Sequence, residues 1–109
     1  MKGSAAMIEE YLKERGAVGE GKAISTDELK RVFHLSRRAL VDVVTRERTA
    51  GSLICSTNSS RGGYYMPSSV EEVRKQRDKL ERGITIRSVV LRSFRRFMKE
   101  HEKREKQNE

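Results

Sequence analysis

Apolar residues recur at intervals of three and four in three stretches within roughly the first 50 residues. Because this spacing aligns side chains on one side of a helix, it predicts helices over residues 5–15, 25–33 and 37–50. The polar residues between the apolar positions would form the outer sides of these helices. The recurring apolar residues are Met7, Ile8, Tyr11 and Leu12 in the first stretch, Leu29, Val32 and Phe33 in the second, and Leu40, Val43 and Val44 in the third.

Capping signals define the ends of the second and third predicted helices. Ser25 is followed three residues later by Glu28, a capping box that satisfies unpaired amides at a helix start. Ser36 is an N-cap candidate for the third helix, since its hydroxyl can accept a hydrogen bond from a first-turn amide. Gly51 stands where a helix end favours a left-handed residue. Only residues 34–36 therefore connect the two helices.

A β-hairpin is expected after the third helix. Residues 53–55 (Leu, Ile, Cys) and 64–66 (Tyr, Tyr, Met) are two short runs with β propensity. The polar segment 56–63 between them ends in two glycines, as hairpin loops often do. Alternation along the second strand would direct one of the two tyrosines inward.

The chain changes character after Pro67. Ser69 with Glu72 repeats the capping box and opens a long helical run, which Gly83 either weakens locally or divides into two helices. Residues 100–109 carry no apolar side chain and are expected to fray. An apolar stripe, defined as Leu80, Ile84, Leu91, Phe94 and Met98, follows heptad spacing together with Val73, Arg77, Arg87 and His101; Ile86, Val90 and Phe97 form a second stripe beside it.

These elements predict a mainly α fold with a small β-hairpin, of the α+β class. We expect one domain over residues 1–67 and a helical segment over residues 68–109. Hydrophobic residues make up 35% of the chain and charged residues 37%, which is little for a monomer that must bury a core. The apolar stripe is therefore expected to pair with a second copy, in parallel or antiparallel orientation.

The order of two helices, a three-residue connection and a hairpin resembles the winged helix-turn-helix over residues 5–67. The resemblance implies DNA binding and a short strand edge at Ala23 and Ile24 beside the hairpin. The runs that look like small phage-type winged-helix proteins of bacteria are LSRRAL (35–40), VTRERTAG (44–51), ICS (54–56) and GYY (63–65).

Glu47 departs from the pattern of this family. Many winged helices place leucine in the last turn of the second helix of the motif, where this chain has Glu47. At 100° per residue Glu47 lies beside Val43 and Val44 on the apolar side. The helix end is therefore exposed there, or the carboxylate is paired.

The charge of the chain favours a polyanionic partner, with nucleic acid ahead of an anionic membrane surface. The formal net charge is +8, and the segment from Lys30 to Arg61 holds seven basic residues against two acidic ones. On the third helix, arginine can pair with guanine while threonine or valine can touch a thymine methyl. The candidate DNA-binding residues are Ser36, Arg37, Arg38, Val41, Asp42, Thr45 and Arg46 on or before that helix, Lys30 and Arg31 on the preceding helix, and Arg61 in the hairpin loop.

Each candidate has a simpler interpretation as a solvated polar residue. The helix face could be an ordinary surface, and Arg61 could be an exposed turn residue and not a minor-groove contact. The tyrosines and phenylalanines could stack on single strands, but their spacing favours core positions. RNA binding by the C-terminal helix, with 13 basic and 8 acidic residues from Val70 to Glu109, is a weaker alternative.

Other chemistries have little support in the sequence. Cys55 is the only cysteine and the two histidines lie far apart, so no metal site and no cofactor are expected. No nucleophile stands near an oriented base, so we expect no enzyme activity. No segment has the length and apolarity of a membrane span, and the protein is expected in the cytoplasm.

The sequence thus predicts a sequence-specific double-stranded DNA-binding protein that is dimeric through its C-terminal helix. The resemblance suggests a transcriptional regulator, or a replication or packaging site-binding protein of a phage or mobile element. The alternative is an adaptor that uses the same fold to dock a protein partner.

Overall fold

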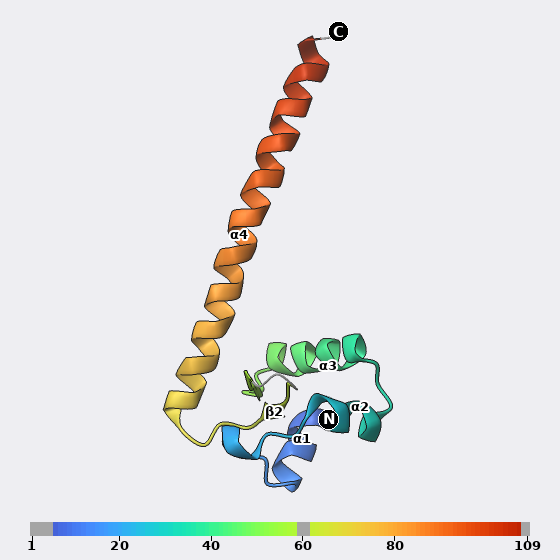
Figure 1. The fold of residues 1–109 in the computed structure, drawn as a ribbon, viewed down its shortest axis with the longest axis vertical. Helices are drawn as coiled ribbons and strands as arrows, with labels where there is room; N and C mark the ends of the chain where they lie inside the picture. The colour runs from blue at the N-terminus through green and yellow to red at the C-terminus, as the bar shows by residue number, and fades with distance from the viewer. Residues whose placement is uncertain (1–5, 59–61, 108–109) are drawn as a thin grey trace. The chain divides into compact units, whose positions relative to one another are not determined.

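The computed structural model describes residues 6–58 and 62–107 of the chain. Helices make up most of these residues, and two short strands form an antiparallel hairpin (Figure 1). This confirms the predicted α+β class and the long C-terminal helix. In chain order the elements are α1 (Met7–Glu14), the 3-10 helix η2 (Glu20–Lys22), α2 (Thr26–Phe33), α3 (Arg37–Thr49), β1 (Cys55–Ser56), β2 (Tyr64–Tyr65) and α4 (Val70–Gln107).

The chain separates into two compact units, Met1–Gln76 and Arg77–Glu109. The first two turns of α4 belong to the first unit, and two of their side chains bind it. The Glu72 carboxylate accepts hydrogen bonds from the backbone amides of Ser68 at 2.8 Å and Glu20 at 3.0 Å, which hold its pKa below the ordinary value. The Gln76 side-chain oxygen accepts from the Ser56 amide at 2.8 Å.

The core of the first unit is built by α1, α2 and α3 with the hairpin. Figure 1 shows α1 and α2 on one side of α3. Burying each large apolar side chain contributes about 1.5–3 kcal/mol, so this cluster is the main source of stability for the unit. The buried cluster comprises Ile8, Leu12, Ala17, Ile24, Leu29, Leu40, Val44, Ile54 and Met66.

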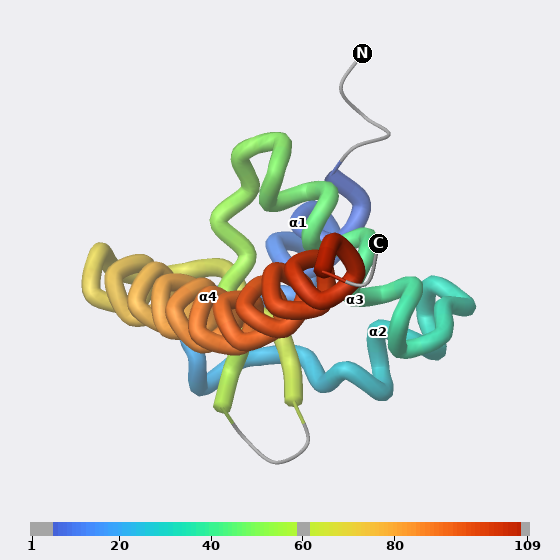
Figure 2. The backbone as a smooth tube through the Cα atoms, turned by 90° about the horizontal axis from the view of Figure 1, so that it is seen from above, coloured from blue at the N-terminus to red at the C-terminus, as the bar shows by residue number. Residues whose placement is uncertain are grey.

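The hairpin is shorter than expected and shifted by one or two residues on its first strand. Cys55 pairs with Tyr65 and Ser56 with Tyr64. Leu53, predicted to begin the strand, is 55% exposed and lies outside it. Ile24 forms a bridge to Tyr64 through two backbone hydrogen bonds of 2.9 and 3.0 Å, so the expected strand edge at Ile24 is present. Figure 2 follows these antiparallel segments along the backbone.

Gly63 is required where the hairpin approaches Ile24. Its φ of 158° accompanies a close backbone contact, since a Cβ built there would lie 2.9 Å from the Ile24 carbonyl oxygen. Any larger residue would displace the bridge between Ile24 and Tyr64. The double glycine of the hairpin loop is thus explained at this position by packing as well as by turn formation.

Glu47 is buried and caps the start of α1. It is 3% exposed, and its two carboxylate oxygens accept from the amides of Ile8 at 2.8 Å and Glu9 at 3.0 Å. These amides belong to the first turn of α1, where no side chain of the preceding residue caps the helix. A carboxylate there also complements the positive end of the helix dipole. Of the two alternatives for Glu47, an exposed helix end or a paired carboxylate, the second is therefore correct, and its partners are backbone amides.

Replacing Glu47 with alanine is expected to lower the free energy of unfolding by about 2–3 kcal/mol, because two buried amides lose their acceptor. Chemical denaturation of the purified variant measures this. Glu14→Ala, an exposed position in the last turn of α1, is the matched control and should leave stability nearly unchanged. Equal stability of Glu47→Ala and the unaltered chain would show that the cap contributes nothing.

The helix α4 is continuous across Gly83 and extends to Gln107. It therefore does not divide into two helices at the glycine. The expectation that residues 100–109 fray was wrong for residues 100–107, which are helical. Their composition explains this, since Glu, Lys, Arg and Gln favour helices and His101 lies 3.7 Å from Glu105 four residues on.

Candidate nucleic-acid interface

A tight connection fixes where α3 begins. His34 ends α2 in the left-handed region, with φ 53° and ψ 47°, and lets the chain reverse within three residues. The Ser25 and Ser36 hydroxyls each accept a hydrogen bond at 3.1 Å, from the Glu28 and Ala39 amides. Both predicted N-caps are therefore present, and the start of α3 is exposed to solvent at Ser36.

The outer face of α3 carries the predicted DNA-contacting side chains. Leu40, Val44 and Glu47 are buried on its inner face and Val43 packs against the same core, so the opposite face of the helix is turned outward. The exposed candidates are Ser36, Arg37, Arg38, Val41, Asp42, Thr45 and Arg46. Among the described residues the guanidinium groups of Arg37, Arg38 and Arg46 form no ion pair. This face therefore combines unpaired positive charge with short polar and apolar side chains.

Two basic residues counted in the sequence patch are engaged within the fold. Arg48 is partly buried and donates from Nε to the Ile54 carbonyl at 2.9 Å, and desolvation lowers its pKa from the ordinary value. Its position four residues after Val44 places it toward the inner side of α3, which helical spacing could have shown. Lys30 is partly buried and lies 4.0 Å from Asp27. Arg31 is exposed.

The remaining candidate, Arg61, lies outside the described residues. The hairpin that leads to it is described up to Asn58 and again from Gly62. On this hairpin Tyr65 is 2% exposed and Tyr64 is partly buried, so Tyr65 is the inward tyrosine of the pair. Burial raises the pKa of the Tyr65 hydroxyl to about 12. Tyr65 is therefore a structural residue and not a surface for base stacking.

Tyr11 and Arg15 join α1 to α2 away from the outer face of α3. The Tyr11 hydroxyl donates to Glu28 at 3.0 Å, and Arg15 lies 2.7 Å from the same carboxylate. The Tyr11 and Phe33 rings meet edge to face with centroids 5.4 Å apart. These contacts place Tyr11 and Phe33 in the packing of the first unit, as their helical spacing suggested.

The second unit has an exposed apolar surface. Within residues 77–107, the five side chains of the apolar stripe are 46–67% exposed, and the Val90 and Phe97 side chains beside it are 51% and 66% exposed. Large apolar side chains that gather on one side of a helix and remain in water indicate an interaction surface. Helical spacing places Phe94 and Phe97 on this surface, and neither lies in a core of the described residues.

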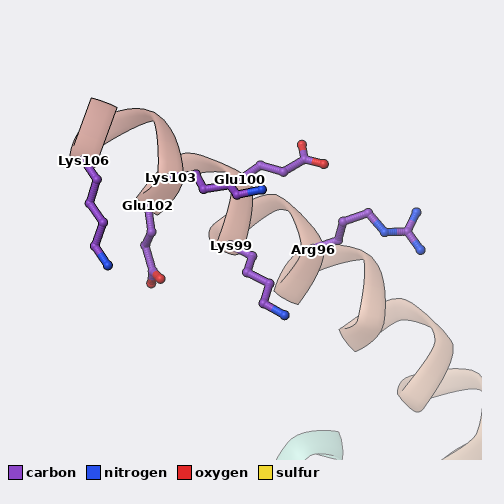
Figure 3. A pocket seen from close by; sticks show the side chains of 6 residues that line it. All are labelled: Arg96, Lys99, Glu100, Glu102, Lys103 and Lys106. Carbon is purple, nitrogen blue, oxygen red and sulfur yellow. The ribbon is translucent and has the colours of Figure 1, made fainter. Parts of the chain in front are cut away.

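The hollows found along α4, one of them beside Leu91, Phe94 and Met98, are bounded by that helix alone. The hollow in Figure 3 is lined by Arg96, Lys99, Glu100, Glu102, Lys103 and Lys106, all from α4. A single helix cannot enclose a small molecule, so this hollow is a space between solvated side chains. Within the described ranges, no cluster of three His, Cys, Asp or Glu side chains could hold a metal ion, and no helix is long and apolar enough to cross a membrane.

Comparisons with protein-family models, curated proteins and solved structures found no match to this chain. What this chain binds is therefore inferred from the residues of the interface themselves.

Proposed function

We propose that residues 1–76 form a winged helix-turn-helix domain that binds double-stranded DNA in a sequence-specific manner, with α3 in the major groove. The observation that carries the proposal is the outer face of α3. There Arg38 and Arg46, with Arg37 at the start of the helix, are exposed and form no ion pair among the described residues, and Val41 and Thr45 lie between Arg38 and Arg46. Arginine can bind guanine O6 and N7 together, and small side chains can contact a thymine methyl.

The start of α3 supports the same placement. The first-turn amides of a helix have no intrahelical acceptor, and the helix dipole favours an anion there. Ser36 caps one amide, while the amides of Arg37 and Arg38 remain available to a backbone phosphate. Arg31 at the end of α2 is a further phosphate contact in this proposal, and Arg61 is the wing contact that the sequence assigns to the hairpin loop.

The proposed protein is a homodimer, because the apolar stripe of α4 stays exposed within residues 77–107. A two-fold dimer would present two copies of α3 to an inverted-repeat DNA site. Its role would be transcriptional regulation, or the marking of a replication or packaging site of a mobile element. In this proposal the protein needs no cofactor and is not an enzyme.

A salt titration against two duplexes tests the proposal. Binding to a preferred duplex should fall about 1,000-fold between 50 and 200 mM salt if about six phosphates are contacted. At fixed salt, the affinity for a scrambled duplex of equal length and composition should be at least about 1,000-fold lower. Equal affinity for both duplexes would contradict sequence-specific binding. Such a result, with no steep salt dependence, would favour the adaptor function, in which the exposed stripe docks another protein.

A further inference from the structure

We propose that residues 77–101 pair in antiparallel orientation with the same segment of a second copy, with the two-fold axis at the level of residue 89. The proposal deepens the proposed homodimer and does not depend on DNA binding. Its starting point is the exposed apolar stripe together with the flanking residues Gly83, Val90 and Phe97.

Charges in the heptad positions oppose a parallel pair. In a parallel, in-register dimer each core residue faces its own copy. Arg77 and Arg87 fall at core positions of this heptad, and Glu105 follows Met98 by seven residues at another. A parallel dimer would therefore face each of these charges with an equal charge. Antiparallel pairing separates all three residues from their copies.

One antiparallel register covers the whole stripe. With the axis at the level of residue 89, Leu80 lies opposite Met98 of the second copy and Ile84 lies opposite its Phe94. Arg87 lies opposite Leu91, where its aliphatic stem can cover the leucine while the guanidinium reaches solvent. The two-fold axis repeats each of these contacts, so all five stripe residues are removed from water.

The flanking positions agree with this register. Gly83 lies in the interior of α4 with an ordinary φ, where glycine costs about 1 kcal/mol relative to alanine. A Cβ added there would meet no atom within 4 Å, so this chain's own packing does not require glycine. In the register above, Phe97 of the second copy lies over Gly83, which explains the missing side chain.

The outer flank provides charge complementarity. Glu81 lies opposite Arg95 of the second copy, and both side chains are exposed in the single chain. Within its own helix the Glu81 carboxylate lies 3.9 Å from Arg77 Nε, which is a long and weak ion pair. Arg95 forms no ion pair among the described residues. In a parallel pair the same heptad positions would place Arg95 beside Val90 and Glu102 beside Phe97.

Disulfide cross-linking of the full chain tests the orientation. Leu80→Cys and Met98→Cys are made separately, and the unaltered chain with its buried Cys55 is the blank. The antiparallel register predicts that neither variant cross-links with itself, because the two copies of each residue lie about 27 Å apart along the axis. An equimolar mixture of the two variants should yield a covalent dimer. Self-cross-linking of each variant would establish a parallel pair and overturn the proposal.

A second variant tests the role of Gly83. Gly83→Leu raises helix propensity and would strengthen a dimer that depended on helicity alone. Under the proposal it fills the space that Phe97 occupies, so the dissociation constant measured by sedimentation should increase at least about 5-fold. Val89→Leu, on the side of α4 opposite Leu80 and Leu91 by helical spacing, is the control and should not weaken the dimer. If no mixture cross-links and sedimentation gives a monomer mass, the proposed dimer itself is overturned. DNA binding plays no part in either measurement, so the proposed function is tested separately.

Discussion

Replacing Arg38 with alanine is expected to cost about 1–3 kcal/mol of discrimination at one or two base pairs and to leave the fold intact. Arg38 lies in the first turn of α3, is exposed, and has no ion pair within the described residues that its loss would disrupt. Relative affinities for a series of single-base variants of the preferred duplex measure the effect, and the denaturation midpoint checks the fold.

Arg82→Ala is the matched control for this experiment. Arg82 is also exposed on a helix, and its replacement removes the same positive charge from the chain. The control should lower affinity slightly for all duplexes, because only the general attraction to phosphate is reduced. If Arg38→Ala behaves in the same way as the control, Arg38 contacts the backbone or nothing, and α3 does not read bases through it.

Combining Leu91→Lys with Phe94→Lys is expected to convert the dimer into a monomer. Each substitution removes an apolar side chain from the stripe and adds a charge, and both copies carry the change. Burial of one leucine or phenylalanine contributes about 1.5–3 kcal/mol, so the dissociation constant should increase by about 1,000-fold or more. Sedimentation at tens of micromolar measures the mass, and binding to an inverted repeat should weaken to the level of a half-site.

The control for the stripe adds the same charge to the other side of the helix. Val89→Lys with Thr85→Lys also adds two lysines and removes one exposed valine, but both positions are turned away from Leu91 and Phe94 by helical spacing. This control should remain a dimer. A monomer mass for the unaltered protein would remove the basis of the prediction, since the stripe would then have no self-association to lose.

Features set by neighbouring residues were predictable from the sequence. The caps at Ser25 and Ser36 depend on a residue and the amide three positions later, and both are present. The inner positions of α3 followed from the 3.6-residue period, and with them the exposed face that carries the arginines. Gly51, which follows the end of α3, has a φ of 109°, and its residue type indicated this positive φ.

Features set by distant residues were not predictable in the same way. The acceptors for the α1 amides come from Glu47, 38 and 39 residues later in the chain. Docking of the first turns of α4 depends on Gln76 reaching Ser56, which no local pattern shows. The start of β1 depends on its partner in Tyr64–Tyr65, so β propensity at Leu53 did not decide it. Arg48 was counted in the basic patch because it donates to the backbone carbonyl of Ile54, and a pattern of side chains does not reveal a backbone acceptor.

Selection of bound DNA from a pool of random duplexes tests the central claim most directly. We expect enrichment of one inverted-repeat sequence by the unaltered protein, and a loss of preference at one or two positions in each half-site by Arg38→Ala. The pool should be challenged at physiological salt with excess competitor duplex, so that general attraction to phosphate does not produce enrichment. A pool that stays random after repeated rounds with folded protein would contradict sequence-specific DNA binding by the outer face of α3.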